Sequence, residues 1–267
     1  MIWITQAPGQ EEQVLQGLLD FVGPHVPIGG GSSSDDLAGG GWLQFTNEAV
    51  FTNAVVVAVL FTSRGVIFSC HSGYEPTQFK ATVTKGGGRT ISELGGRPAA
   101  QVYNEWSGGT ITSALAEGGQ VLMKTTLSPL GRVVGKTGEI PYFQLSHPNQ
   151  VTADGSMTVF SDVAVGDEMF LMCGSPESLV SRVGRVARFL RRPSGEDHQI
   201  VGAIVIYCAG CMLTIQDRMT EVVSTIRTDL GDEVPFLGVF TLGEQGCFLG
   251  GENRHGNLMI SVLAFLD

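Results

Sequence analysis

Apolar residues recur along the chain with two periods, and these predict an alternation of strands and helices. Residues 2–5 favour a short strand, and residues 11–22 place apolar side chains at the spacing of one helix face. The same order returns later. Residues 200–207 form the most apolar run, typical of a central strand, and residues 219–230 form another amphipathic helix. We expect two strand–helix pairs far apart in the chain.

Both strand–helix pairs end in the same pattern of residues. Gly23-x-x-Val26-Pro27 matches Gly231-x-x-Val234-Pro235 in spacing, and each leads to a glycine-rich loop and an apolar strand. In the first half that strand spans residues 54–61 and has the composition of a buried strand. We interpret the match as a diverged internal repeat. A repeat would place residues 29–36 and 238–251 at equivalent positions in two similar halves. The alternative is chance convergence of composition.

The middle of the chain is rich in strands and turns. Residues 78–84 and 90–94 predict a hairpin around the turn at 85–89, and a short helix follows at 98–106. Pro176 begins a longer helix, and Arg188, Arg191 and Arg192 at its end suit a solvated helix terminus. Further strands are expected at residues 121–127, 142–145, 157–160 and 168–173.

These elements predict an α+β fold of two pseudo-symmetric, sheet-containing halves with outer helices and mostly antiparallel sheets. The paired glycines at 108–109 and 118–119 mark the boundary. We therefore expect domains at residues 1–110 and 111–267.

The glycine-rich stretch before the last strand carries the first candidate site. Glu244 is set between Gly243 and Gly246, so nothing bulky beside it shields the carboxylate. It can accept hydrogen bonds from a ligand amine, or it can orient the loop by binding backbone amides. His255 and Asn257 add a titratable group and an amide nearby, although a structural histidine is an alternative.

A second polar loop occupies the corresponding place in the first half. Ser32 and Ser33 precede Asp35 and Asp36 there. Hydroxyls beside carboxylates suit a pocket for a polar ligand, and they equally suit a surface turn. We predict a ligand-binding role for Ser32, Ser33 and Asp35.

Other chemistry has weaker support. Cys208-Ala-Gly-Cys211 has the spacing of a redox pair, but no helix is evident at the first cysteine, so we expect structural thiols and keep a thiol-dependent enzyme as an alternative. No second pair of ligands completes a metal site, and no nucleophile elbow or phosphate-binding loop occurs. We expect no metal, no cofactor and no catalytic residues.

Charge and hydropathy limit the partners. A net charge of −10 repels phosphate backbones, and no apolar run reaches the roughly 20 residues that span a bilayer. The 5 cysteines do not suggest a secreted disulfide framework. We expect a cytoplasmic protein that binds neither nucleic acid nor membranes.

Several motifs together resemble the FIST family. The block from Thr241 to Gly251, followed by His255-Gly-Asn257, is similar to the Gly-Glu-Ile-Gly-Pro and His-Asn signature that closes the FIST C-terminal domain, with departures at Gln245 and Cys247. The segment Tyr207-Cys-Ala-Gly-Cys211 resembles a strand end of that domain, with Cys211 where arginine is common. Motifs similar to the FIST N-terminal domain are Gly73-Tyr74, Val83-Thr84 and the block 94–99.

The resemblance implies a sensory or signal-transduction module that binds a small ligand such as an amino acid and is not an enzyme. It also implies further elements before the first strand, so the start looks shortened. Because related domains occur behind F-boxes, the alternative is an interaction module that recruits substrates to a ubiquitin ligase. We expect an amino-acid-like ligand and a possible signalling or ubiquitin-ligase partner.

Overall fold

The computed structural model describes residues 1–35, 40–190, 199–247 and 251–267. They form two compact units: the first contains residues 1–73 and 176–267, and the second contains residues 74–175. About 25% of the described residues are helical and 44% are in strands, mostly antiparallel, which confirms the α+β class. The expected boundary at residues 110–111 falls within the second unit and stays a prediction about domain halves.

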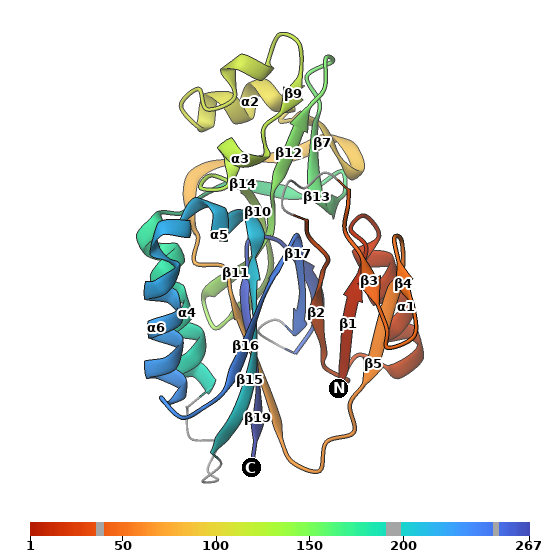
Figure 1. The fold of residues 1–267 in the computed structure, drawn as a ribbon. Helices are drawn as coiled ribbons and strands as arrows, with labels where there is room; N and C mark the ends of the chain where they lie inside the picture. The colour runs from red at the N-terminus through yellow and green to blue at the C-terminus, as the bar shows by residue number, and fades with distance from the viewer. Residues whose placement is uncertain (36–39, 191–198, 248–250) are drawn as a thin grey trace. The chain divides into compact units, whose positions relative to one another are not determined.

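The first unit contains two sheets (Figure 1). A five-stranded sheet has the order β18-β17-β2-β1-β5, and a four-stranded sheet has the order β16-β15-β19-β6. The strands of the first sheet are β1 (Ile2–Gln6), β2 (Ile28–Ser32), β5 (Val55–Val59), β17 (Gly243–Cys247) and β18 (Asn253–Gly256). Those of the second are β6 (Val66–His71), β15 (Ile200–Cys208), β16 (Phe236–Thr241) and β19 (Ile260–Leu266). A small hairpin joins β3 (Gln44–Phe45) to β4 (Val50–Phe51).

Helices flank both sheets. Helix α1 (Glu11–Val22) buries Leu15 against Ile2, Ile4 and Ile28, so it covers one face of the five-stranded sheet. The Phe68 ring of β6 reaches the other face of that sheet at Gly246. Helices α4 (Pro176–Leu190) and α6 (Met219–Leu230) pack on each other, and α4 also packs on β6 and β19. The first unit is therefore layered as helix, sheet, sheet and helices.

The two strand–helix pairs expected from sequence have the same connectivity. Strands β1 and β2 are parallel neighbours joined through α1, and β15 and β16 are parallel neighbours joined through α6. The amide of Ile2 donates to the Pro27 carbonyl at 2.9 Å, and the amide of Ala203 donates to the Pro235 carbonyl at 3.0 Å. This likeness supports an internal repeat, which stays a prediction until the halves are superposed. Asp36 and residues 248–250 of the compared loops lie outside the described residues.

The strand expected to be buried at residues 54–61 is an edge strand, so that prediction is wrong. In β5 the side chains of Val55, Val57 and Val59 are 41%, 42% and 57% exposed. Their run of apolar residues does not reveal whether a sheet continues beyond it, and here the sheet ends.

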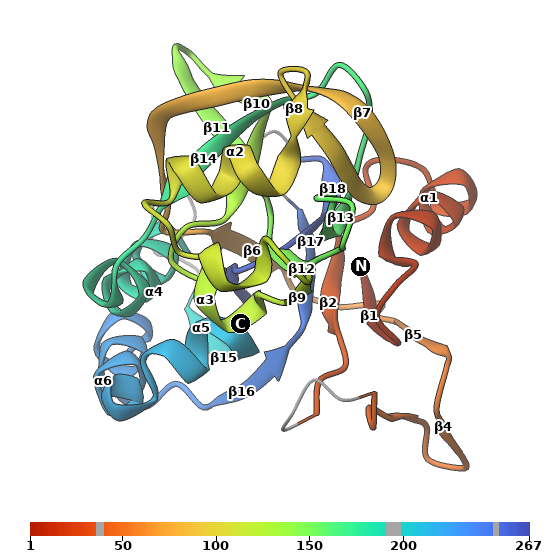
Figure 2. The same cartoon turned by 90° about the horizontal axis from the view of Figure 1, so that it is seen from above.

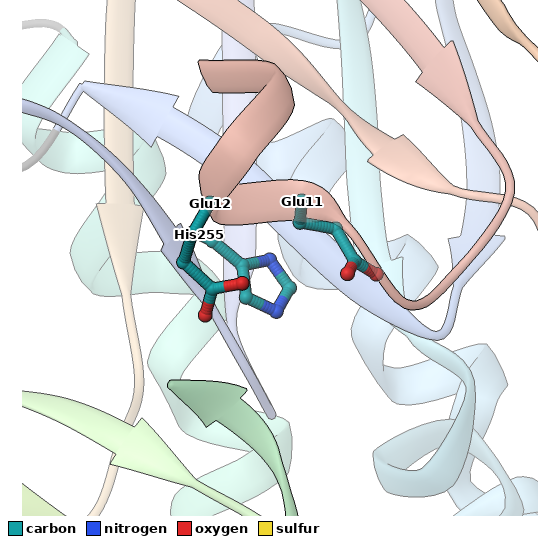
Figure 3. A group of neighbouring side chains, drawn as sticks. All are labelled: Glu11, Glu12 and His255. Carbon is teal, nitrogen blue, oxygen red and sulfur yellow. The ribbon is translucent and has the colours of Figure 1, made fainter. Parts of the chain in front are cut away.

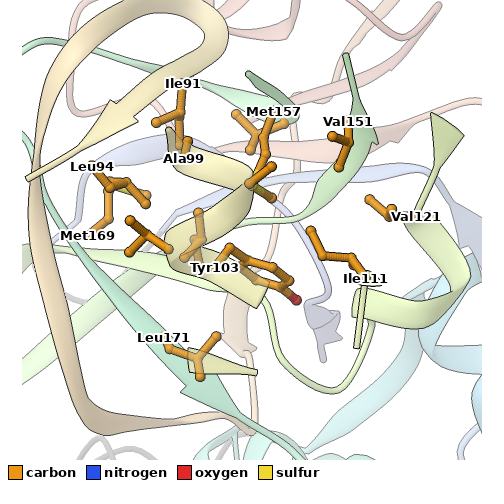
Figure 4. Close-up of a cluster of buried hydrophobic side chains, with 14 of the residues drawn as sticks. Ile91, Leu94, Ala99, Tyr103, Ile111, Val121, Val151, Met157, Met169 and Leu171 are labelled. Atoms are coloured by element: carbon orange, nitrogen blue, oxygen red, sulfur yellow. The ribbon is translucent and has the colours of Figure 1, made fainter. Parts of the chain in front are cut away.

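The second unit is an eight-stranded sheet built around one long strand, β7 (Glu75–Leu94). The order is β11-β10-β14-β7-β13-β12-β9, with β8 paired to β7. The remaining strands are β8 (Arg97–Pro98), β9 (Gly119–Gln120), β10 (Leu130–Thr137), β11 (Ile140–Ser146), β12 (Pro148–Val151), β13 (Met157–Val163) and β14 (Glu168–Cys173). Its helices are α2 (Ala99–Trp106) and α3 (Leu122–Thr125). Tyr103 of α2 packs in an apolar core with Ile91, Met157 and Met169 (Figure 4).

Two sequence predictions fail in this unit. The hairpin expected around residues 85–89 is one curved strand (Figure 2), whose first half pairs with β14 and whose second half pairs with β13. The glycines at 86–88 therefore bend the strand instead of reversing it. The strand expected at residues 121–127 contains the helical turn α3 instead.

Candidate functional site

The pleat of the five-stranded sheet divides the predicted ligand-binding residues between its two faces. In the register of β17, Gly243 lies opposite Ser32, and Gln245 lies opposite His255. Neighbouring residues of a strand point to opposite faces. Ser32, Gln245 and His255 therefore share the face that α1 covers, whereas Glu244 points toward the four-stranded sheet.

A hydrogen-bonded group lies under the start of α1, and we call it the α1-face cluster: Glu11, Ser32, Gln245, His255 and Asn257. Ser32 Oγ donates to Glu11 Oε1 at 2.6 Å. Gln245 Nε2 lies 3.3 Å from Ser32 Oγ and 3.2 Å from His255 Nδ1. Asn257 Nδ2 lies 3.3 Å from His255 Nε2. All five side chains are buried, so strands and a helix from both ends of the chain build one polar centre.

Glu11 and Gln245 were missed by the sequence reasoning. Glu11 begins α1, where negative charge is favourable, and its Oε2 accepts the Gly9 amide at 2.9 Å. The available signal was an acidic pair, Glu11 and Glu12, at the start of an amphipathic helix. Gln245 was noted only as a departure from the family pattern, yet it connects Ser32 to His255.

A pocket of about 350 Å³ adjoins this region at the end of β1. Its lining residues are Gln6, Ala7, Pro8, Gly9, Gln10, Val14, Asn53, Ala54 and Val55. Gln6 pairs with Ser32 in the sheet and is only 1% exposed. Within the described part of the chain, neither polar atom of the Gln6 amide has a hydrogen-bond partner. A buried amide without partners is costly, and this one belongs to a residue that lines the pocket.

The predicted loop residues Ser33 and Asp35 have partners inside the loop. Ser33 Oγ accepts a hydrogen bond from Gln44 Nε2 at 3.1 Å, and Gln44 Oε1 accepts the Ala54 amide at 3.0 Å. Ser33 thus braces the pocket wall. Asp35 Oδ2 accepts the Gly41 amide at 2.7 Å, as a loop-closing residue does.

Glu244 lies on the other face of the sheet and is only 2% exposed. Its Oε1 accepts the Thr241 hydroxyl at 2.8 Å, and its Oε2 accepts the Met259 amide at 3.0 Å. Burial raises the pKa of Glu244 to about 8, although these two hydrogen bonds act in the opposite direction. Its contacts therefore hold the segment before β19 in place, as in the loop-orienting alternative.

The glycines beside Glu244 make room for rings of the protein itself. A Cβ on Gly243 would lie 2.4 Å from His255 Cε1, and a Cβ on Gly246 would lie 2.6 Å from Phe68 Cε1. The close approach expected from these glycines is thus made by His255 on one face and Phe68 on the other.

The two cysteines of Cys208-Ala-Gly-Cys211 do start a helix, so the reason given for excluding redox chemistry is wrong. Helix α5 (Ala209–Thr214) begins directly after Cys208. Both thiols are nevertheless buried, and Cys211 Sγ lies 3.8 Å from the Leu258 carbonyl oxygen. A hydrogen bond with Cys211 and burial raise the pKa of Cys208 well above its ordinary value, which opposes thiolate formation.

We therefore expect Cys208 and Cys211 to be unreactive in the folded protein. A thiol-specific reagent should modify the exposed Cys173 quickly and the buried pair only on unfolding. Peptide mapping by mass spectrometry after timed labelling measures this, and Cys173→Ser removes the fast site as a control. Reduction of an insulin-type disulfide by the wild type, lost in a Cys208→Ser/Cys211→Ser variant, would contradict the structural role.

Comparison with known proteins identifies the family. The FIST N domain matches residues 2–97, and the FIST C domain matches residues 99–247. The chain belongs to the FIST family, whose domains are associated with sensory and signal-transduction modules.

Two further similarities are more limited. An uncharacterized protein of Methanocaldococcus jannaschii is 35% identical over 92 residues, which cover 34% of this chain and 18% of that relative. This match therefore spans less than a fifth of the relative's length. A crystal structure of 2C-methyl-D-erythritol 2,4-cyclodiphosphate synthase from Plasmodium vivax is 15% identical, covers 57% of this chain and 97% of that chain, and has a TM-score of 0.20, too low for any inference. None of the helices in the described ranges is long and apolar enough to cross a membrane.

Proposed function

We propose that this chain is a sensory module that binds a small, amino-acid-like ligand in the pocket at the end of β1. The observation that supports it most is the buried side-chain amide of Gln6, a residue that lines the pocket, because neither polar atom of the amide has a partner in the described chain. A ligand that reaches the amide would satisfy both of its polar atoms and remove the cost of leaving them unpaired.

The surroundings of Gln6 suit a ligand that carries one positive and one negative charge. An amide offers one acceptor and one donor group, which match the ammonium and the carboxylate of an α-amino acid. The start of α1 borders the pocket, and a helix N-terminus favours a carboxylate. A pocket of about 350 Å³ lies within the usual range for small-molecule sites.

The ligand-binding residues predicted from the sequence stay a prediction. They are Gly243, Glu244, Gly246, His255, Asn257, Ser32, Ser33 and Asp35. Ser32 and His255 belong to the α1-face cluster, and Ser33 braces the pocket wall through Gln44. In this proposal Ser32, Ser33 and His255 hold Gln6 and the start of α1 in position. Glu244 lies on the opposite face of the sheet, where it holds the segment before β19 by accepting a hydrogen bond from the Met259 amide.

Thermal-shift screening of amino acids and related metabolites tests the proposal. A ligand at a hundred times its dissociation constant should add about 2.7 kcal/mol to the free energy of unfolding. In Gln6→Met that stabilisation should disappear, while the ligand-free variant is at least as stable as the wild type because two unpaired buried polar atoms are removed. The exposed Gln101→Met is the matched control and should respond as the wild type does.

Two outcomes would contradict this assignment. If Gln6→Met keeps the full thermal shift, the ligand binds elsewhere. If Gln6→Met alone strongly destabilises the protein, the amide has a structural role instead.

A protein-interaction role is the second candidate, and the exposed valines of β5 favour it. An edge strand with apolar side chains can pair with a strand of another protein. Recruitment of a substrate to a ubiquitin ligase would use such a surface. Hydrogen exchange separates the two candidates, because a pairing partner protects the amides of β5, whereas a small ligand protects the turn between β1 and α1.

A further inference from the structure

Three potential metal ligands converge where α1 begins, and we propose that Glu11, Glu12 and His255 bind a divalent metal ion of the Zn²⁺ or Mn²⁺ class. One ligand atom from each side chain lies within 4.8 Å of the other two. In Figure 3 the His255 ring lies between the carboxylates of Glu11 and Glu12, which both belong to the first turn of α1. This site goes beyond ligand binding at Gln6 and does not depend on it.

The spacing needs only a small adjustment to suit a metal ion. Nitrogen and oxygen ligands lie about 2.1 Å from Zn²⁺, so two ligands of a tetrahedral ion are roughly 3.4 Å apart. The present upper limit of 4.8 Å is reduced to that range by side-chain rotation. Glu12 is only partly buried, whereas Glu11 and His255 are buried.

Hydrogen bonds orient two of the three ligands. Ser32 Oγ and the Gly9 amide donate to the two oxygens of Glu11. Each carboxylate oxygen carries two lone pairs, so an oxygen that accepts a hydrogen bond can also bind a metal ion. Metal-binding carboxylates are commonly held by such surrounding donors.

The surroundings of His255 supply an independent indication. The amide nitrogens of Gln245 and Asn257 lie 3.2 Å and 3.3 Å from the two ring nitrogens of His255. A neutral imidazole accepts at one nitrogen only, because the other carries the proton. Gln245 is fully buried, and its Oε1 has no partner among the described residues.

Turning the Gln245 amide by 180° resolves the first of these features and moves Gln245 Nε2 to the place where Oε1 now has no partner. The Oε1 atom of Gln245 would then accept the hydrogen bond that His255 Nδ1 donates. The Nε2 atom of the His255 ring would keep its lone pair. A metal-binding histidine is usually held in this way, with its other ring nitrogen donating to a carbonyl oxygen. Gln245 is therefore the positioning residue of the proposed site.

The donor set and its charge select the kind of ion. Two carboxylates and one imidazole favour Zn²⁺ or Mn²⁺ over soft ions, which prefer sulfur ligands. Two buried or partly buried negative charges side by side are unfavourable, and a divalent cation neutralises them. Three protein ligands also leave coordination positions open for water or a bound molecule.

Titration of the chelator-treated full chain with Mn²⁺, followed by electron paramagnetic resonance, tests the site. Mn²⁺ is chosen because it avoids the cysteine thiols. We expect one ion per chain at a concentration well below that of general binding to the acidic surface. Glu12→Gln and His255→Gln should each raise the dissociation constant at least tenfold, and Gln245→Leu should raise it by about 10- to 100-fold through loss of the positioning contact.

The exposed Glu48→Gln is the matched control and should bind Mn²⁺ as the wild type does. The proposal is overturned if the three site variants bind Mn²⁺ as tightly as the wild type does. It is also overturned if Glu48→Gln weakens Mn²⁺ binding as much as the site variants do, which would indicate adventitious surface ions only. Should His255→Gln fail to fold by circular dichroism, Glu12→Gln decides the question, because the partly exposed Glu12 side chain can change without disturbing the core.

Discussion

Glu244→Gln should be clearly more stable than the wild type at pH 8.5 and close to it at pH 5. Burial raises the pKa of Glu244 from 4.5 to about 8 in the folded protein. Between these two values the folded chain keeps a proton that the unfolded chain has released, so the free energy of unfolding of the wild type falls as the pH rises. The unfolding equilibrium shifts about tenfold per pH unit between these two pKa values, which is on the order of 5 kcal/mol in all.

Chemical denaturation of both proteins from pH 4 to pH 9 measures the difference. Glutamine keeps the shape and an acceptor for the Met259 amide, but it does not titrate in this range. The exposed Glu48→Gln provides the control for a general loss of negative charge. Parallel stability curves for the wild type and Glu244→Gln would show that Glu244 is ionised throughout, held by its two donors.

Arg182→Met should destabilise the protein by about 3–5 kcal/mol at pH 8. The side chain is fully buried, and Nη1 donates to the carbonyl oxygens of Ser72 and Leu258, each at 2.6 Å. The guanidinium carbon also lies 4.5 Å from the centre of the Tyr207 ring. Methionine fills most of the volume but leaves two buried carbonyl groups without these donors.

Leu258 adds to the expected loss. Its φ of 58° is in the left-handed region, which costs roughly 1–2 kcal/mol for a residue other than glycine. Arg182 stabilises that conformation through the Leu258 carbonyl, between Asn257 of the α1-face cluster and Met259, which binds Glu244. Arg182→Met should therefore disturb both polar groups.

Urea unfolding of Arg182→Met and Arg182→Lys measures this loss. Lysine keeps the charge but not the planar group that lies over Tyr207, so we expect an intermediate loss. Part of the loss in Arg182→Met should vanish at pH 5, because Arg182 favours the ionised form of Glu244, which is then protonated. A loss below about 1 kcal/mol at both pH values would contradict a structural role for Arg182.

Local patterns determined the helices well. The spacing of apolar residues at 11–22 and the proline at 176 predicted α1 and the start of α4, and both are found at these positions. Periodicity and caps act within a few turns of one segment, so they can be recognised without knowledge of the fold. The sequence also contained enough of the FIST motifs to indicate the family, which the domain matches confirm.

Burial and pairing depended on partners that are distant in sequence. The apolar residues of β5 were expected inside and lie at an edge. The glycines at 86–88 were read as a turn, and they bend a strand whose halves have different partners. The burial and pairing of each segment depend on which other element packs against it. The sequence of that segment alone does not show this.

By itself, the sequence determined the fold class, the principal helices and the family, and it predicted a candidate site in the region of β17. Only the tertiary structure decided how that region is divided, because the register of β17 turns Glu244 to one face and Gln245 to the other. It also brought Glu11 and Glu12, near the start of the chain, beside His255, near its end. The physical reason is that a pleated strand alternates its side chains between two environments, and the sheets and helices that pack on each face determine what those environments are.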